Sequence, residues 1–109
     1  MKIDDMITTI KLYLQLYLMY AKKIFDRSND INAKAMILIS LRYDDIKEII
    51  NDILKEKEKF YELVKEGNYS EAYIIYKNIE YKYKIAEKML LERIENLVKI
   101  RALELSKKY

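Results

Sequence analysis

The feature that most constrains the fold of this chain is the near absence of helix-breaking residues. Its 109 residues include one Gly and no Pro. Pro removes a helical hydrogen bond and Gly raises the entropic cost of ordering the backbone, so long segments without them favour long helices. The chain also has no His, Cys or Trp, and His and Cys are the commonest catalytic bases, nucleophiles and zinc ligands. The pattern predicts an all-α protein that is not an enzyme and needs no cofactor.

Size and charge predict a single helical domain over residues 1–109. The chain has a mass of 13.2 kDa, with 51% hydrophobic and 36% charged residues, and a net charge of +3. This charge is too balanced to indicate nucleic acid or an anionic membrane by itself. A domain of this size leaves roughly a third of its unfolded surface exposed, so pairing with a second chain is a natural way to enlarge the core.

Cellular location and origin are indicated only by composition. The absence of Cys fits an intracellular protein, and we expect a cytoplasmic one. The bias toward Ile, Lys, Glu and Tyr is typical of proteins from heat-loving archaea or their viruses. The longest apolar run, residues 12–21, is shorter than the roughly 20 residues that a transmembrane helix needs, so no membrane association is expected.

Two clusters of turn-forming residues divide the chain. The first is residues 27–30, where Asp30 can cap a new helix, and the second is Gly67 with Asn68, a helix end followed by a restart. These breaks predict helices over residues 5–25, 31–66 and 69–107. We expect an antiparallel three-helix bundle in which the short first helix packs on a coiled-coil-like hairpin of the two long ones.

The second helix carries one alternative. Asp45, followed three residues later by Glu48, is a candidate capping box that would break this helix between Arg42 and Asp45 and give four helices. A continuous helix is favoured, because no Gly or Pro forces a break there.

The helix lengths predict a projecting arm. At 1.5 Å per residue the three helices measure roughly 32, 54 and 58 Å, so the first one cannot reach Gly67. We expect the hairpin around Gly67 to extend beyond the three-helix region. Its exposed tip would bind a partner through Phe60, Tyr61, Leu63, Tyr69 and Tyr73.

Heptad-like apolar rows predict which faces of the long helices pack together. The third helix carries the row Ala72, Tyr76, Ile79, Tyr83, Ala86, Leu90, Ile94 and Leu97. Polar residues follow it, so we expect the core to end near Val98. The second helix carries the row Ala35, Leu38, Ile46, Ile49, Ile53, Phe60 and Val64, with Arg42 as its one polar interruption.

Surplus apolar faces predict self-association. The first helix has almost no polar side between residues 12 and 20, and the third helix has a second apolar row nearly opposite the first. Either a second chain covers these faces as a homodimer, or Tyr hydroxyls keep them in water. The residues expected to self-associate are Leu12, Leu16, Tyr20, Ile74, Tyr81, Ile85 and Met89.

Charged residues support two weaker hypotheses. The acidic row Asp44, Glu48, Asp52 and Glu56 is interpreted as a solvated face and not as a metal site. An accessory role in nucleic-acid machinery is the alternative function, with contacts from Lys99, Arg101, Lys107 and Lys108. Acidic residues spaced for pairing with the basic ones make it second to a non-enzymatic interaction or scaffold protein. That protein would self-associate and bind other proteins through apolar and Tyr-rich helix faces.

Overall fold

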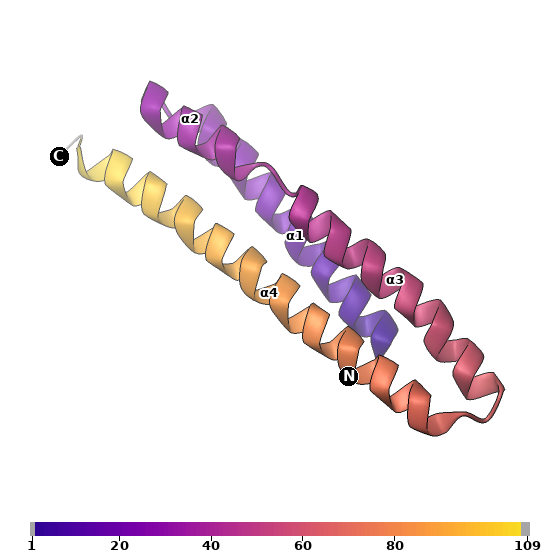
Figure 1. The fold of residues 1–109 in the computed structure, drawn as a ribbon. Helices are drawn as coiled ribbons and strands as arrows, with labels where there is room; N and C mark the ends of the chain where they lie inside the picture. Colours follow the sequence, from indigo (N-terminus) through magenta and orange to yellow (C-terminus); the bar gives the residue numbers. More distant parts are fainter. Residues whose placement is uncertain (1, 108–109) are drawn as a thin grey trace.

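The computed structural model describes residues 2–107 and is all-α, as predicted (Figure 1). Its helices are α1 (Ile3–Arg27), α2 (Ile31–Ser40), α3 (Asp44–Lys65) and α4 (Tyr69–Ser106). α1 and α4 run in one direction, and α2 and α3 follow each other in the opposite direction. The shape is elongated, with principal extents of 63 × 18 × 16 Å. α4 packs against each of the other helices and is therefore the central helix of the fold.

The prediction of a continuous helix over residues 31–66 is wrong, and the break lies where the four-helix alternative placed it. Ile37 of α2 and Ile46 of α3 both lie in the core, yet they are nine residues apart. At about 100° per residue, a continuous helix would place them on opposite sides. The break around Arg42 brings both side chains toward the core.

The same change of phase corrects the predicted apolar row of the second helix. Ala35 and Leu38 are exposed, and Ala33 and Ile37 are buried in their place. Farther along, Val64 is exposed and Leu63 is buried. The expectation that Leu63 is exposed at the hairpin tip is therefore wrong, because its side chain is among the buried residues of α3.

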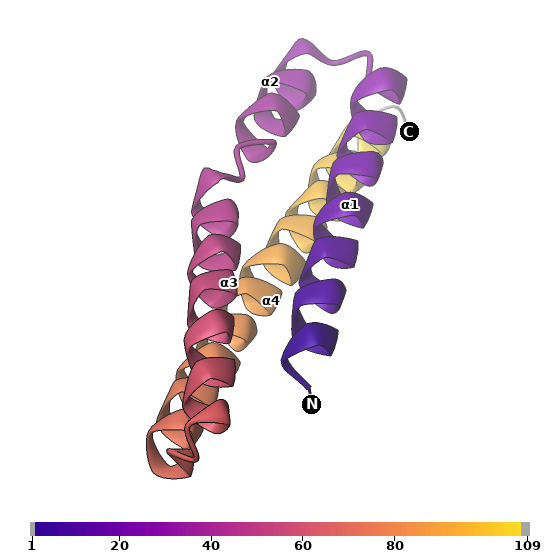
Figure 2. The ribbon, with the colours of Figure 1, turned by 90° about the vertical axis from the view of Figure 1, so that its right-hand side faces the viewer.

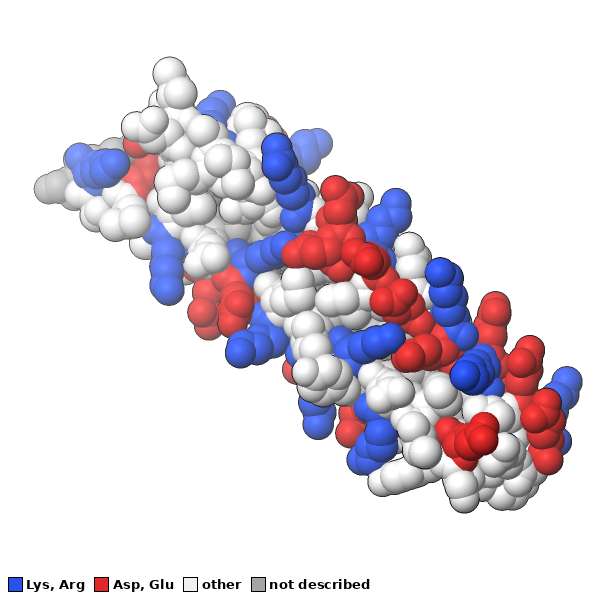
Figure 3. All heavy atoms as spheres, in the orientation of Figure 1, with Lys and Arg blue, Asp and Glu red and all other residues white. Residues whose placement is uncertain are grey.

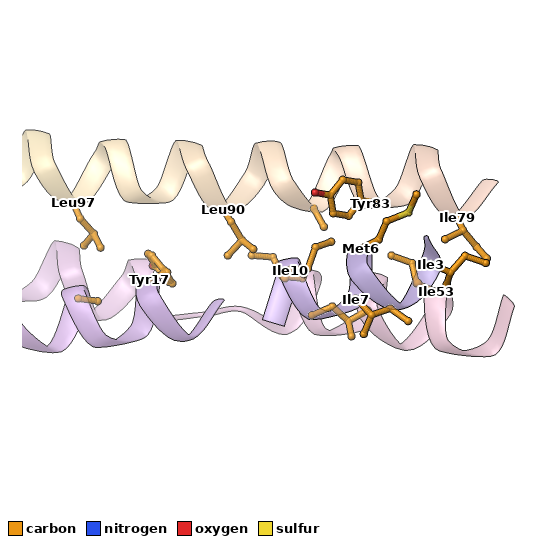
Figure 4. Packing of buried hydrophobic residues seen from close by; sticks show 14 of the residues in the cluster. Ile3, Met6, Ile7, Ile10, Tyr17, Ile53, Ile79, Tyr83, Leu90 and Leu97 are labelled. Carbon is orange, nitrogen blue, oxygen red and sulfur yellow. The ribbon is translucent and has the colours of Figure 1, made fainter. Parts of the chain in front are cut away.

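The core runs along α4, as its apolar row predicted. Figure 4 shows Leu90 and Leu97 of α4 pointing into the same layer as Ile10 and Tyr17 of α1. The core does not end near Val98, which is exposed. Instead Ile100 is buried, and Glu104, one turn later, is the last buried residue among those that the structure describes in α4.

The α3–α4 hairpin turns at Gly67, which has the positive φ of 77° that favours glycine. The Asn68 amide donates to the Leu63 carbonyl at 2.9 Å and the Gly67 amide to the Val64 carbonyl at 3.1 Å, which is a Schellman motif. Within the described residues, the side chain of Asn68 makes no capping bond to α4. Figure 2 shows this hairpin extending beyond the N-terminal end of α1 as the expected arm.

Candidate interaction surface

α2 is the most unusual helix for its position, because it is apolar and largely exposed. Its sequence has one charged residue, Lys34, and its only buried residues are Ala33 and Ile37. Ile31 is 82% exposed and Ile39 is 67% exposed. A helix on the surface of a protein ordinarily turns a polar face to water. Figure 3 shows the result, an uncharged area over the α2 end of the molecule.

Three adjoining hollows lie between α2 and the last turns of α4, and together we name them the α2–α4 groove. The central hollow has a volume of about 470 Å³. It shares Ile39, Ser40 and Asn96 with the hollow at one end, and Met36, Ile100 and Leu103 with the hollow at the other. The α2 side of the groove is lined by Asp30, Asn32, Met36, Ile39 and Arg42. The α4 side is lined by Arg93, Asn96, Ile100, Leu103 and Lys107.

One end of α2 is fixed by Tyr17, a fully buried residue of α1. Its hydroxyl donates a hydrogen bond to the carbonyl of Ser40, the last residue of α2. Burial raises the pKa of this hydroxyl above its ordinary value of 10.0, while the charges of Arg93 and Asp45 act on it in opposite directions. Tyr17 is therefore a neutral donor that stabilises the end of α2 at neutral pH.

Asp45 fixes the start of α3 beside the same end of the groove. The guanidinium of Arg93 on α4 lies 2.6 Å from its carboxylate, and the Ile46 amide donates to it at 2.9 Å. Partial burial opposes ionisation of Asp45, but these hydrogen bonds outweigh it and hold the pKa below the ordinary 3.8. The α2–α3 break is thus tied to both α1 and α4.

Glu104 fixes the other end of α2 and was missed by sequence reasoning. Its carboxylate accepts from the Ser28 hydroxyl at 2.6 Å and from the Asn29 amide at 3.1 Å, and Arg101 lies 3.3 Å away. The hydrogen bond from Ser28 is the largest cause that lowers the pKa of Glu104 below its ordinary 4.5. A signal was present, because Glu104 lies seven residues after the buried Leu97 on the same face of α4.

The residues expected to self-associate do not form one surface. Tyr20 lies in a hollow between α1 and α4 with Ile24, Ile94, Leu97 and Val98. Ile85 precedes Ile94 by nine residues, which places it on the opposite side of α4. The set divides into the exposed Leu12, Tyr20, Ile74 and Tyr81 and the half-buried Leu16, Ile85 and Met89.

The hairpin tip keeps part of its expected aromatic surface. Tyr61, Tyr69 and Tyr73 are exposed. Phe60 is half-buried and contacts the rings of Tyr61 and Tyr76, with centroid separations of 5.3 and 6.3 Å. The tip is therefore a smaller apolar surface than the sequence predicted, since Leu63 is buried.

The four basic residues proposed to contact nucleic acid have different environments. Arg101 is engaged with Glu104, and Lys107 lies 3.8 Å from Asp30. Lys99 is exposed and has no ion-pair partner within residues 2–107. Lys108 lies outside the described residues. The structure thus leaves only one of the three described residues unpaired.

The acidic row on α3 is partly used in ion pairs. Glu56 lies 3.1 Å from Lys82 of α4. Among the residues that the structure describes, no group of three or more acidic side chains is arranged to hold a metal ion. Over the same part of the chain, no helix has the length and apolar character needed to cross a bilayer.

Comparison with known proteins adds no relative: no protein-family model matches the chain, and no curated protein or solved structure is significantly similar to it.

Proposed function

We propose that this chain is a non-enzymatic helical interaction or scaffold protein, which self-associates and binds protein partners through apolar helix faces. The observation that carries the proposal is the α2–α4 groove. Met36, Ile39 and Leu103 line it and are between 51% and 67% exposed. An apolar groove between two helices is a common docking surface for a helix of another chain. A cytoplasmic location remains part of this proposal.

The groove is favoured over the other apolar surfaces because its walls are fixed. Tyr17 ties the end of α2 to α1, and Glu104 ties the turn before α2 to α4. A binding surface that is already ordered loses less side-chain and backbone entropy when a partner docks. Among the exposed Tyr side chains at the hairpin tip, Tyr61 shares a hollow with the first residues of α1, whereas Tyr69 and Tyr73 lie on the first turns of α4. Within the described residues, no comparable buried hydrogen bond fixes them, so they are a secondary surface.

Nucleic-acid binding is the weaker alternative. Arg101 and Lys107 are both within ion-pair distance of acidic residues, and a phosphate would have to compete with those carboxylates. Lys99 adds a single free cation on α4. Affinity for nucleic acid rises with the number of phosphates that a protein neutralises, so this arrangement favours the interaction protein.

A photoreactive amino acid at the groove tests the proposal whatever the identity of the occupant. We would place benzoylphenylalanine at Ile39, and at the equally exposed Tyr81 as the matched control. Both proteins would be irradiated pure and in an extract of native cells. We expect a discrete cross-linked protein from position 39 and a much weaker one from position 81. Equal cross-linking at both positions, or none at position 39, contradicts the proposal.

A further inference from the structure

We propose that the occupant of the α2–α4 groove is a second copy of this chain, with the two α2 helices packed antiparallel about a two-fold axis near Met36. This inference rests on the proposed function and adds to it the partner and its register. In a two-fold interface the same patch is used by both copies, so each contact occurs twice. The groove must therefore be complementary to itself.

The charges at the two ends of the groove are complementary in this way. Asp30 lines one end with Glu104 and Lys107, and Arg42 lines the other with Asp44, Asp45 and Arg93. Glu104, Asp45 and Arg93 are already held in ion pairs within the chain. Asp30 and Arg42 each lie six positions from Met36. Antiparallel pairing around Met36 brings Asp30 of one copy to Arg42 of the other, on both sides of the axis. Parallel pairing would place Asp30 beside Asp30 and Arg42 beside Arg42, which is costly at an interface.

Arg42 is available for such a pair. It is exposed and has no ion-pair partner within residues 2–107. Asp30 accepts from the Asn32 amide at 2.9 Å, and its nearest cation, Lys107, is 3.8 Å away. A carboxylate has acceptor sites left after these contacts, so it can also receive a guanidinium.

The centre of the interface would be mainly apolar, although Ser40, Asn96 and Lys99 also line the central hollow. Met36 of one copy faces Met36 of the other, and Ile39 of each copy lies opposite Ala33 of its partner, with Leu103 beside them on each α4. The two α2 helices and the two α4 ends then form a four-helix core, an arrangement in which helices pack efficiently. A further apolar hollow, around Tyr20 and Val98, is lined by no charged residue. Nothing there would fix the register of a second copy.

The exposed area of the single chain is also consistent with a missing partner. The accessible surface is 7666 Å². A typical folded monomer of 13.2 kDa exposes about 6,400 Å², so this chain exposes about 1,200 Å² more. A stable interface of standard size buries about 800 Å² on each partner. Pairing through one such interface would remove most of the excess.

Charge reversal at the two ends of the groove gives a specific test. In Asp30→Arg a guanidinium would face the guanidinium of Arg42 across the axis, and in Arg42→Asp a carboxylate would face the carboxylate of Asp30. We expect each variant alone to dimerise at least about tenfold more weakly than the wild type in sedimentation equilibrium. In an equimolar mixture, a heterodimer has an opposite-charge pair at one end and the two introduced residues, also of opposite charge, at the other. We therefore expect heterodimers of near wild-type affinity.

A cysteine variant gives a second readout that does not depend on the N-cap at Asp30. The chain has no Cys, so Met36→Cys introduces a single thiol near the proposed axis. We expect it to form a disulfide dimer under mild oxidation, and the exposed control Ile74→Cys to stay monomeric. Circular dichroism would check that every variant is folded.

Two results would overturn the inference. One is a wild type that stays monomeric at all concentrations; the other is a mixture of the two reversed variants that associates no better than either alone. If the photoreactive group at position 39 then joins the chain to a different protein, the proposed function stands and only the second copy is excluded. If position 39 joins it to nothing, the proposed function fails as well.

Discussion

Ser28 and Glu104 form a buried hydrogen bond of 2.6 Å between positions 76 residues apart in the chain. Ser28 is the first residue after α1, and Glu104 lies in the last turn of α4. The contact holds the turn that leads into α2 against α4. Because α2 forms one wall of the groove, this polar pair determines where that wall begins.

We expect the stabilising effect of Glu104 to depend on pH. Its pKa is lowered in the folded protein, mainly by the Ser28 hydrogen bond. A lowered carboxyl pKa adds stability above the unfolded-state value, and this is lost as pH falls through the folded-state value. Glu104→Gln should therefore be less stable than the wild type at neutral pH. The difference in unfolding free energy should shrink once pH falls below the ordinary value of 4.5.

Urea unfolding of both proteins, from neutral pH down to about pH 3, would measure this difference. Glu92→Gln is a suitable control, because Glu92 is exposed and lies 4.0 Å from Lys88. A Glu104→Gln difference that stays constant with pH would show that the carboxylate charge does not matter to this contact.

The Ser28 hydroxyl can be tested separately by Ser28→Ala. Removing it takes the shortest hydrogen bond from an oxygen of the buried Glu104 carboxylate and leaves Arg101, 3.3 Å away, beside that oxygen. Such a loss costs about 1–3 kcal/mol. Ser106→Ala removes an exposed hydroxyl, which donates to the carbonyl of Leu103 at 2.8 Å. We expect that control to change the unfolding free energy by less than about 0.5 kcal/mol. If Ser28→Ala and Ser106→Ala change the unfolding free energy by similar amounts, the buried hydrogen bond of Ser28 stabilises the fold no more than an exposed one does.

Tyr17→Phe should loosen the end of α2 and leave the bundle folded. The substitution keeps the buried ring and removes the hydrogen bond to the Ser40 carbonyl, at a cost of about 0.5–1.5 kcal/mol. Hydrogen exchange should become faster in α2 than in α3. Tyr20→Phe is the control, since Tyr20 is half-exposed and makes no hydrogen bond within the described residues. If hydrogen exchange in α2 is the same in Tyr17→Phe as in the wild type, the Tyr17 hydroxyl does not position the end of α2.

Sequence reasoning succeeded where one periodic pattern served one helix. The row on α4 predicted its buried face from Ala72 to Leu97, and the single Gly predicted the hairpin turn. The buried face follows from a regular apolar repeat and the turn from the backbone preference of Gly, and both signals can be read from the sequence alone.

It failed where two helices of different phase follow each other without Gly or Pro. Arg42 interrupted the expected apolar row, and that interruption marks the α2–α3 break. A continuous helix appeared equally regular because Leu38 and Ile46 share a face, and only packing against α1 and α4 selects Ile37 for the core. Glu104 was missed for a related reason. Its partners, Ser28 and Asn29, come from a distant turn.

The groove and the faces expected from the sequence make different predictions for self-association. Ile39→Glu with Leu103→Glu places charges on two groove residues that are more than 60% exposed, so the monomer should stay folded while the dimer dissociates. Leu12→Glu with Tyr81→Glu places charges on exposed residues of the other faces. We expect this control to dimerise like the wild type. Light scattering after size exclusion would decide, and the reverse outcome would restore the faces of α1 and α4 as the interface.

The salt dependence of binding separates a scaffold from a nucleic-acid protein. A protein that neutralises several phosphates loses affinity steeply with salt, with a logarithmic slope near −0.9 per phosphate on duplex DNA and about −0.7 on single strands. Arg101 and Lys107 are near acidic residues, so we expect only weak binding and a shallow slope.

The variant for this test changes Lys99, Lys107 and Lys108 to Gln and leaves Arg101 in place, because Arg101 supports Glu104. Fluorescence anisotropy with single-stranded and duplex DNA over a salt series would give both slopes. If the chain is a scaffold, the triple variant should dimerise like the wild type, and its weak binding to DNA should not depend on dimerisation. Sub-micromolar affinity at about 0.15 M salt, lost in the triple variant while the dimer persists, would instead favour the nucleic-acid role, since at that ionic strength only several direct phosphate contacts retain such affinity.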